Sequence, residues 1–469
     1  MDIEHVIVLM LENRSFDCIL GRLYPQDPDF RGLTLNESNH YGMTYGVWND
    51  PNLTSATACI PDPDPGEAFQ DMNVQLFGAA GRASGATADM SGFALSYGTL
   101  PASAGYRDPG AVMHYFTPDQ VPVISALARA FGVCDYWHAS APCQTWPNRF
   151  FVHTGTSSGY VDNNSFKVPF EAPSLFRRLE DCGKSWRVYF HDMPQSILLK
   201  DILPCALAHY RFFGQFLADA HTGALPAYSF IEPQYFTDLL SNRIPNDQHP
   251  PHNVLYGERL IAEVYGAVRN SPCWKKTLLI ITYDEHGGCY DHIVPPSATP
   301  PDDSTNNSDG FVFNAYGVRV PAVIVSPWIA PGTKVRPPQR DTGSPFDHAS
   351  IIKTVRELFE LGPALTARDD VAPSILPVLA LATPANDGPQ SLPVALDAPD
   401  PDLVAARAAA PPNGMQQALA AAAALLPDAP PATDSAAPAA EELPDPTRYS
   451  TVALACAAAT ARLKTFLQF

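Results

Sequence analysis

Residues 277–296 read T-L-L-I-I-T-Y-D-E-H-G-G-C-Y-D-H-I-V-P-P. Residues 278–282 form a continuous apolar and β-branched run, which is typical of a strand buried on both faces of a sheet. The run ends abruptly in ionisable side chains, namely Asp284, Glu285, His286, Asp291 and His292. Because ligands bind at the carboxyl ends of strands in open α/β sheets, this stretch predicts an α/β fold and a functional site.

The side chains at this strand end are of the kinds that bind divalent cations. Asp284 and Glu285 supply carboxylate oxygens, and His286 and His292 supply imidazole nitrogens. The glycine pair at 287–288 allows the backbone to turn tightly beneath them. A polar loop with an N-cap aspartate is the alternative interpretation, but the end of a buried strand rarely carries four ionisable groups without a function.

A second buried strand is predicted near residue 1. Residues 4–11 read E-H-V-I-V-L-M-L and lead directly into Glu12 and Asn13. Two strands far apart in the sequence, each ending in possible metal ligands, indicate one site at the top of a single parallel sheet. Asn13 or Ser15 can also cap a helix that continues to Leu23. Both interpretations hold together if Ser15 is the cap and Glu12 and Asn13 face the metal.

Further candidates lie in the middle of the chain. Thr145 follows a loop in Q-T-W-P-N-R, where a hydroxyl can act as a nucleophile if a cation lowers its pKa. Spacing alone identifies this threonine only weakly. His191 ends a predicted strand at 186–191. His249 and His252 lie in the proline-stiffened segment D-Q-H-P-P-H, for which a surface turn is the alternative.

The predicted elements alternate between strands and helices over most of the chain. A helical pattern at 257–268 precedes the strand at 277, and His348 precedes a helix at 349–361 for which Asp347 is the expected N-cap. Residues 25–110 show little periodicity and are expected to form long loops over the site, with one helix near 68–77. We therefore assign residues 1–380 to one catalytic domain.

The composition changes near residue 380. Alanine and proline dominate the remainder, with acidic residues between them, which is typical of a linker with short helices. Helices are expected at 415–426 and 449–469, and the last can pack on the main body. Residues 381–469 are therefore predicted to form a helical appendage rather than a second catalytic domain.

Bulk properties exclude several functions. The net charge of −19 argues against binding to nucleic acid and against electrostatic adsorption to strongly anionic membranes. No apolar run approaches the roughly 18 residues of a transmembrane helix. The N-terminus lacks the basic region of a signal peptide, so a cytoplasmic location is the default expectation, with secretion or peripheral membrane attachment left open.

Six motifs occur in a characteristic order. They are E-N-R-S-F-D at 12–17, T-x-P-N-R at 145–149, D-x-H-P-P-H at 247–252, Y-D-E-H-G-G-x-Y-D-H-x-x-P-P at 283–296, S-P-W-I-x-P-G-T at 326–333 and D-H-x-S-I-x-x-T at 347–354. Over roughly residues 3–362 the chain resembles the phosphoesterase family of bacterial phosphatidylcholine phospholipases C, plant non-specific phospholipases C and related acid phosphatases. The resemblance implies an alkaline-phosphatase-like three-layer sandwich, a mostly parallel central sheet with helices on both faces.

The resemblance also assigns roles to the candidate residues. It places Thr145 on the family's nucleophile, and it places four residues around a divalent metal ion: Glu12, Asn13, Asp284 and Glu285. Histidines would hold phosphoryl oxygens or the leaving group, with His249 foremost and His191, His286, His292 and His348 beside it. Where many relatives carry a histidine in D-P-G-H, this chain has Glu67. Glu67 must then replace that histidine, or its role passes elsewhere.

These assignments predict a metal-dependent phospholipase C type phosphodiesterase. It would cleave glycerophospholipids such as phosphatidylcholine at a membrane or micelle surface, through a phosphothreonine intermediate. The carboxylate-rich ligand set suits Mg²⁺, Ca²⁺, Mn²⁺ or Zn²⁺. An acid phosphatase acting on soluble monoesters is one alternative. A catalytically idle protein that binds lipid or phosphate is another.

Overall fold

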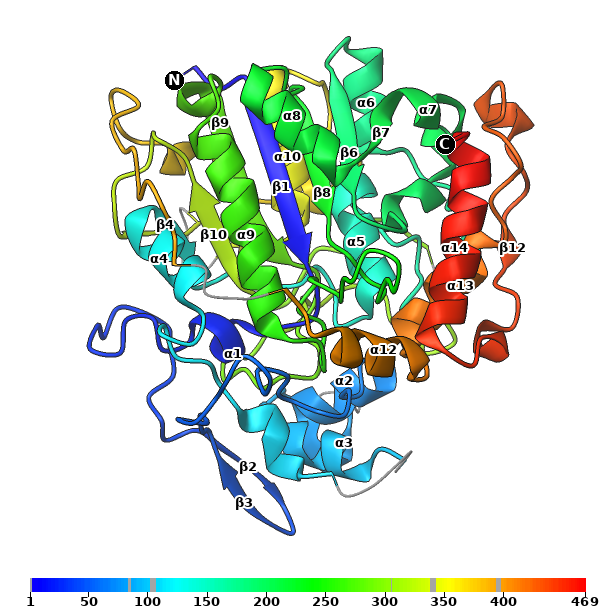
Figure 1. Ribbon diagram of the computed structural model, residues 1–469. Helices are drawn as coiled ribbons and strands as arrows, with labels where there is room; N and C mark the ends of the chain where they lie inside the picture. Colours follow the sequence, from blue (N-terminus) through cyan, green and yellow to red (C-terminus); the bar gives the residue numbers. More distant parts are fainter. Residues whose placement is uncertain (1, 83–85, 102–106, 305, 338–342, 394–397) are drawn as a thin grey trace.

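The computed structural model describes residues 2–82, 86–101, 107–304, 306–337, 343–393 and 398–469. Its centre is an eight-stranded sheet (Figure 1). The strands are β1 (His5–Leu11), β4 (Gly132–Cys134), β6 (Trp186–Phe190), β7 (Tyr210–Phe212), β8 (Tyr228–Glu232), β9 (Thr277–Tyr283), β10 (Ala322–Val325) and β11 (Thr333–Lys334). Their order in the sheet is β11-β4-β10-β9-β1-β8-β6-β7.

Most neighbouring strands run parallel. β1 lies between β8 and β9 and pairs in parallel with both, whereas β10 runs antiparallel to β9 and β4. Leu11 of β1 is the register partner of Tyr283 of β9. The two strands therefore end at the same level, and the residues that follow them, Glu12 and Asp284, leave the sheet side by side. This register creates the site.

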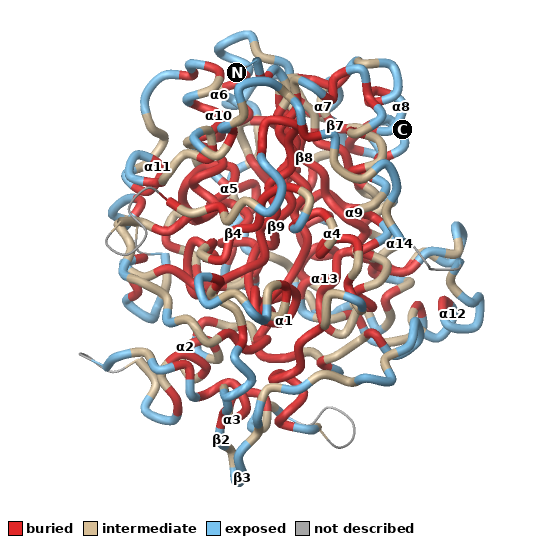
Figure 2. The backbone as a smooth tube through the Cα atoms, turned by 90° about the vertical axis from the view of Figure 1, so that its left-hand side faces the viewer, coloured by how far each residue is buried: buried red, intermediate tan, exposed pale blue. Residues whose placement is uncertain are grey.

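Helices cover both faces of the sheet, so the predicted three-layer architecture is confirmed. In Figure 1, α8 (Phe213–Thr222) and α9 (Val254–Arg269) lie in front of the sheet, whereas α5 (Thr145–Thr154) and α10 (Ala349–Phe359) lie behind it. α4 (Pro122–Ala130) packs beside α9, and α6 (Leu175–Asp181) packs beside α5. Figure 2 shows the buried segments concentrated in the strands and in the helix faces against them.

A smaller layer lies beyond the carboxyl ends of the strands. In Figure 1 the β1 arrow points toward it, past α1 (Phe16–Leu20). It consists of β2 (Ser38–Tyr41), β3 (Met43–Gly46), α2 (Phe69–Phe77) and α3 (Phe93–Thr99), and it has its own apolar cluster. We name this layer, residues 25–115, the cap. The sequence predicted α2 but neither α3 nor the hairpin, because short elements in proline- and glycine-rich chain leave little periodicity.

Helices from the C-terminal segment pack on the main body. They are α12 (Pro401–Ala409), α13 (Gly414–Ala423) and α14 (Val452–Leu467), and the short strand β12 (Glu441–Glu442) pairs with β5 (Lys167–Val168). Buried side chains of α13 and α14, among them Leu419 and Phe466, belong to the same apolar cluster as the central sheet. Residues 394–397 lie outside the described residues.

Several predicted helix ends differ from the structure by a few residues; α10, for example, ends at Phe359 rather than at 361. α1 ends at Leu20 rather than at Leu23. The expectation that Asp347 caps α10 is wrong, because the N-cap residue is His348. The Asp347 carboxylate instead accepts a hydrogen bond from the Ser140 hydroxyl at 2.8 Å.

The remaining short helix α7 (Ala206–His209) follows β6, and α11 (Ala367–Val371) follows α10. Among the described residues, no helix has the length and apolar composition that crossing a membrane requires.

Candidate active site

The two strand ends supply a buried pair of acidic residues. The backbone N–H groups of Asn13 and Glu285 both donate to Asp284 Oδ1, at 3.0 and 2.8 Å. Glu12, Asn13, Asp284 and Glu285 are all inaccessible to solvent. The structure thus brings together the four residues that the motifs assign to a metal ion, from positions about 270 residues apart in the chain.

Arg149 connects this group of acids to α5. Its Nη2 lies 3.1 Å from Glu12 Oε1, and its Nε lies 3.2 Å from Asp284 Oδ2. A third carboxylate, that of Glu232 at the end of β8, lies 4.0 Å from Nη1. Arg149 was not among the candidate residues predicted from the sequence. Its position four residues after Thr145 was the available signal, because residues at i and i+4 share one face of a helix.

Thr145 occupies the first turn of α5 and points at the same group. Its hydroxyl donates to Asn13 Oδ1 at 3.4 Å, and it is fully buried. The N-terminus of a helix carries unpaired backbone N–H groups and a positive dipole end, both of which favour a bound anion such as a phosphoryl group. Thr145 therefore lies between a helix N-terminus that can bind a phosphoryl group and the carboxylates of Glu12 and Asp284 that can bind a cation.

Several buried acceptors in this region have no hydrogen-bond partner among the described residues. They include Glu12 Oε2, Glu285 Oε1 and Asp247 Oδ2. Burial raises the pKa of Glu12 and of Glu285 well above the ordinary value of 4.5, although Arg149 opposes the shift at Glu12. A bound divalent cation would offset this cost, and an oxygen-rich set of donors is what hard cations prefer. The residues present therefore fit a divalent metal ion.

Asp247 was not among the predicted ligands. It follows the long loop after β8, and its carbonyl oxygen accepts the backbone N–H of Glu12 at 2.8 Å. Its Oδ1 lies 2.7 Å from His252 Nδ1, which leaves Oδ2 unpaired. The motif D-x-H-P-P-H contains this aspartate, so its place beside two histidines was an available signal.

His249 lies between two acids of the cap. Its Nε2 is 3.4 Å from Glu67 Oε1, and its Nδ1 is 3.7 Å from Asp64 Oδ1. Burial lowers the pKa of His249, but these carboxylates outweigh burial and hold that pKa well above its ordinary value of 6.5. Glu67 also accepts a hydrogen bond from Asn13 Nδ2 at 2.8 Å. The glutamate at the family's histidine position thus contacts both His249 and a candidate metal ligand.

His348 and His286 contact Asp284 and Glu285, the two residues that follow β9. His348 Nε2 lies 2.6 Å from the carbonyl oxygen of Asp284, and Trp137 Nε1–H donates to its Nδ1 at 3.4 Å. His286 lies between Glu285, 3.3 Å away, and the Gln75 side chain, 2.8 Å away. Burial lowers the pKa of His348 to about 4 and that of His286 to about 3. Both rings are therefore neutral near pH 7.

His191 and His292 have other partners. Neither forms a hydrogen bond or ion pair with Glu12, Thr145 or Asp284 in the part of the chain that the structure describes. His191 Nδ1 lies 3.0 Å from the carbonyl oxygen of Glu232. His292 Nδ1 lies 2.6 Å from Asp17 Oδ2.

A second acidic group surrounds His292. Asp17 and Asp291 each lie 2.9 Å from the guanidinium of Arg319, which is itself fully buried. Every carboxylate oxygen of Asp17 and Asp291 has a partner, namely Arg319, His292 or a backbone N–H, whereas oxygens of the first group remain unpaired. We assign it a structural role, joining the start of α1 to the segment after β9.

Comparison with known proteins identifies the family. A model of the Phosphoesterase family matches residues 3–362 of the chain. The chain belongs to the Phosphoesterase family. Non-specific phospholipase C1 of Arabidopsis thaliana is 38% identical over 409 residues, which cover 83% of this chain and 74% of that protein. Phospholipase C A of Mycobacterium tuberculosis is 29% identical over 435 residues, 82% of this chain and 78% of that protein. The protein is therefore a phosphoester-hydrolysing enzyme.

Solved structures give a more distant likeness. The phosphonate monoester hydrolase of Agrobacterium radiobacter matches this phosphoesterase with a TM-score of 0.32 and 12% sequence identity. The match covers 80% of this chain and 77% of that one.

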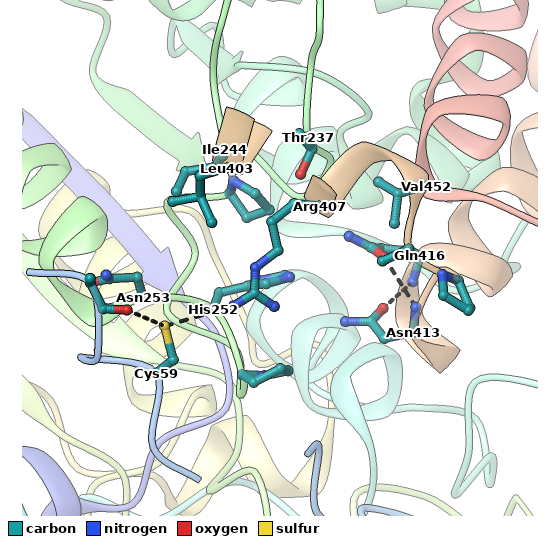
Figure 3. Close-up of a pocket in the computed structure, with 15 residues that line it drawn as sticks. Cys59, Thr237, Ile244, His252, Asn253, Leu403, Arg407, Asn413, Gln416 and Val452 are labelled. Atoms are coloured by element: carbon teal, nitrogen blue, oxygen red, sulfur yellow. Dashed lines mark hydrogen bonds between the residues drawn. The ribbon is translucent and has the colours of Figure 1, made fainter. Parts of the chain in front are cut away.

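A cavity of about 110 Å³ adjoins the segment 251–253 of this phosphoesterase, which follows His249. Figure 3 shows Arg407 of α12 pointing into it, toward His252 and Cys59. Leu403 of α12 and Gln416 of α13 also line the cavity. The Gln416 side chain donates to the carbonyl oxygen of Tyr235 at 2.7 Å. The C-terminal segment thus forms one wall of a cavity whose opposite wall carries His252, the partner of Asp247.

Proposed function

We propose that this protein is a metal-dependent phospholipase C type phosphodiesterase that uses Thr145 as its nucleophile. The observation that carries the proposal is the meeting of the buried Thr145 hydroxyl with Asn13, next to the carboxylates of Glu12 and Asp284. The names of the relatives support the phospholipase C assignment over other phosphoester substrates.

Glu12, Asn13, Asp284 and Glu285 would hold the metal ion, with Asp247 as a further donor. A divalent cation bound there would supply a Lewis acid that lowers the pKa of a nearby hydroxyl and neutralises charge on phosphoryl oxygens. Arg149 would fix the positions of Glu12 and Asp284 through its two contacts of 3.1 and 3.2 Å. The cap and the sheet enclose these groups, which limits the access of water.

The reaction would proceed by two displacements. Thr145 Oγ, having released its proton to solvent, would attack phosphorus as the alkoxide, forming a phosphothreonine as the bond to the glycerol oxygen breaks and diacylglycerol leaves. His249, held by Glu67 and Asp64, would give a proton to the departing oxygen. Water would then give one proton to His249 and attack phosphorus, which would release the phosphorylated headgroup and leave Thr145 again as the alkoxide.

Parallel assays on phosphatidylcholine micelles and p-nitrophenyl phosphate would test this function. Faster turnover of phosphatidylcholine, with diacylglycerol and phosphocholine as products, is expected. Faster turnover of the monoester would identify an acid phosphatase instead. No turnover of either substrate in the presence of Mg²⁺, Ca²⁺, Mn²⁺ or Zn²⁺ would favour a protein that only binds lipid or phosphate.

A further inference from the structure

Two leucines are exposed at the tip of the loop that joins β8 to the candidate site. The side chain of Leu240 is 100% exposed and that of Leu239 is 52% exposed. The backbones of Asp238 and Arg243 form two hydrogen bonds across the base of the tip, at 2.9 and 3.0 Å. Asp238 Oδ1 also accepts the backbone N–H of Leu240 at 2.9 Å. The turn is therefore held in a defined shape that presents both leucines to solvent.

Further apolar side chains lie near this turn. A cavity of about 400 Å³ opens beside it and is lined by Phe212 and Leu217, both partly exposed, together with Arg243 and Arg259. The ring of Phe469, near the end of the chain, packs 5.0 Å from that of Phe212. In Figure 1 the C-terminus lies beside β7, which ends at Phe212. Exposed apolar side chains gathered beside a cavity that also carries arginines suit contact with a membrane surface, where acyl chains lie next to charged headgroups.

The arginines of this cavity are available to bind phosphate. The guanidinium of Arg243 has no hydrogen bond or ion pair within the described parts of the chain. Arg259 contacts Glu263 at 3.9 Å, which is a weak, exposed pair. Arginine binds phosphate oxygens in pairs through its planar guanidinium, so these side chains complement the headgroups of a phospholipid.

The stem of the loop leads directly to the candidate site. Glu232, at the end of β8, lies beside Arg149, and Asp247 follows the loop at its other end. Gln234 and Asn246 close the stem with hydrogen bonds of 2.7 and 3.1 Å. Asn242 Nδ2 braces the tip against the carbonyl oxygen of Pro399, just before α12. The loop therefore connects the exposed tip to two residues, Glu232 and Asp247, that lie at the candidate site.

We propose that the turn formed by Asp238–Arg243, here named the leucine turn, docks the enzyme on a zwitterionic phospholipid surface. Leu239 and Leu240 enter the boundary between headgroups and acyl chains, while Arg243 and Arg259 contact lipid phosphates. The net charge of −19 disfavours strongly anionic surfaces, which selects phosphatidylcholine-rich ones. The proposal rests on the proposed function, because it supplies that site with its lipid substrate.

Sedimentation with phosphatidylcholine vesicles tests the docking. The double variant Leu239→Ser/Leu240→Ser should partition into vesicles roughly tenfold or more weakly than the wild type, because two apolar side chains no longer leave water. Val371→Ser is the matched control, since Val371 of α11 is 45% exposed and lies outside the leucine turn. Its partition should equal that of the wild type. Equal partition of the double variant and the wild type would overturn the proposal.

A second readout separates docking from chemistry. The double variant should lose turnover on vesicles but keep wild-type turnover on dihexanoyl phosphatidylcholine below its critical micelle concentration. A double variant that loses turnover equally on both substrates would overturn the docking role. If wild type binds vesicles through the leucine turn but hydrolyses neither substrate, the docking stands and the proposed function falls. A dimer in solution that the double variant abolishes, without any vesicle binding, would make the surface a protein interface and overturn the proposal.

Discussion

The Nε of Arg149 lies 3.2 Å from Oδ2 of Asp284, although the two residues are 135 positions apart in the chain. This contact joins the helix that carries Thr145 to the end of the strand that carries the acids. Because both partners are buried, each depends on the other for charge compensation. Arg149 therefore sets where Thr145 lies relative to Glu12 and Asp284.

Replacing Arg149 should destabilise the protein strongly. In protein kept metal-free with a chelator, Arg149→Gln would leave Glu12 and Asp284 buried without a cation, and the loss of one partner of a buried pair costs about 3–5 kcal/mol. Urea unfolding measures this change. Arg149→Lys keeps the charge but cannot make both contacts, so an intermediate loss is expected. Wild-type stability in Arg149→Gln would show that the acids need no compensation.

Thr145→Ala should lose activity by several orders of magnitude and keep its fold. The side chain contributes one long hydrogen bond of 3.4 Å, so its removal should change the melting temperature little. Thr145→Ser retains the hydroxyl and should retain measurable turnover. Intact mass of the enzyme quenched during turnover should show one added phosphoryl-headgroup mass that is absent from Thr145→Ala. Label at another residue would refute the nucleophile.

Metal binding should depend on Asp284 and not on Asp291. Chelation should abolish turnover, and Asp284→Asn should weaken divalent-cation binding by about 10- to 100-fold, as measured by calorimetry. Asp291→Asn is the control, because Asp291 pairs with Arg319 in the second acidic group. It should lower stability while leaving the affinity for the cation unchanged. The opposite pattern would move the metal site to the group around His292.

Much of the candidate site could be predicted from one rule, that ligands bind at the carboxyl ends of the strands of an open α/β sheet. Buried runs at 4–11 and 277–283 are recognisable without a structure, and ligands follow the carboxyl ends of such strands. The register of β1 on β9, which places Glu12 beside Asp284, had no sequence signal of its own. It depends on which strands become neighbours.

The partners of the acids were less predictable. Arg149, Glu232 and Asp247 reach the candidate site from separate elements of the fold. Charged residues are usually exposed, so the sequence alone gives no reason to expect these three to be buried. His191 and His292 illustrate the converse. Each follows a strand end, as the rule requires, yet one bonds a backbone carbonyl and the other bonds Asp17.

The pairing of His292 with Asp17 should make stability depend on pH. Burial lowers the pKa of His292, but the Asp17 carboxylate outweighs burial, and the pKa in the folded protein is raised above 6.5. Protonated His292 is therefore favoured by folding. Its contribution is full below pH 6.5 and is lost as the pH rises through the folded pKa. The difference in unfolding free energy between the wild type and His292→Gln should be larger at pH 6 than at pH 9; an equal difference would contradict the pairing.

The C-terminal segment should stabilise the main body without supplying catalytic groups. Leu419 of α13 is fully buried in the cluster that includes the sheet, so Leu419→Ala should cost about 2–5 kcal/mol. Leu454 of α14 is 54% exposed, and Leu454→Ala should change stability by less than about 0.5 kcal/mol.

Deletion after residue 380 extends the same reasoning to the whole segment. It would expose the apolar surface that α13 and α14 cover, so solubility and melting temperature should fall. Every candidate ligand, and the proposed nucleophile Thr145, precedes residue 349, so turnover of a small soluble phosphoester per folded molecule should survive. Arg407 and Gln416 border the cavity beside His252. Deletion would remove this wall, so turnover of large lipid substrates is more sensitive to the deletion than turnover of a small phosphoester. If turnover of the small phosphoester vanished while the core stayed folded, the segment would be part of the catalytic site, and the boundary at residue 380 would be wrong.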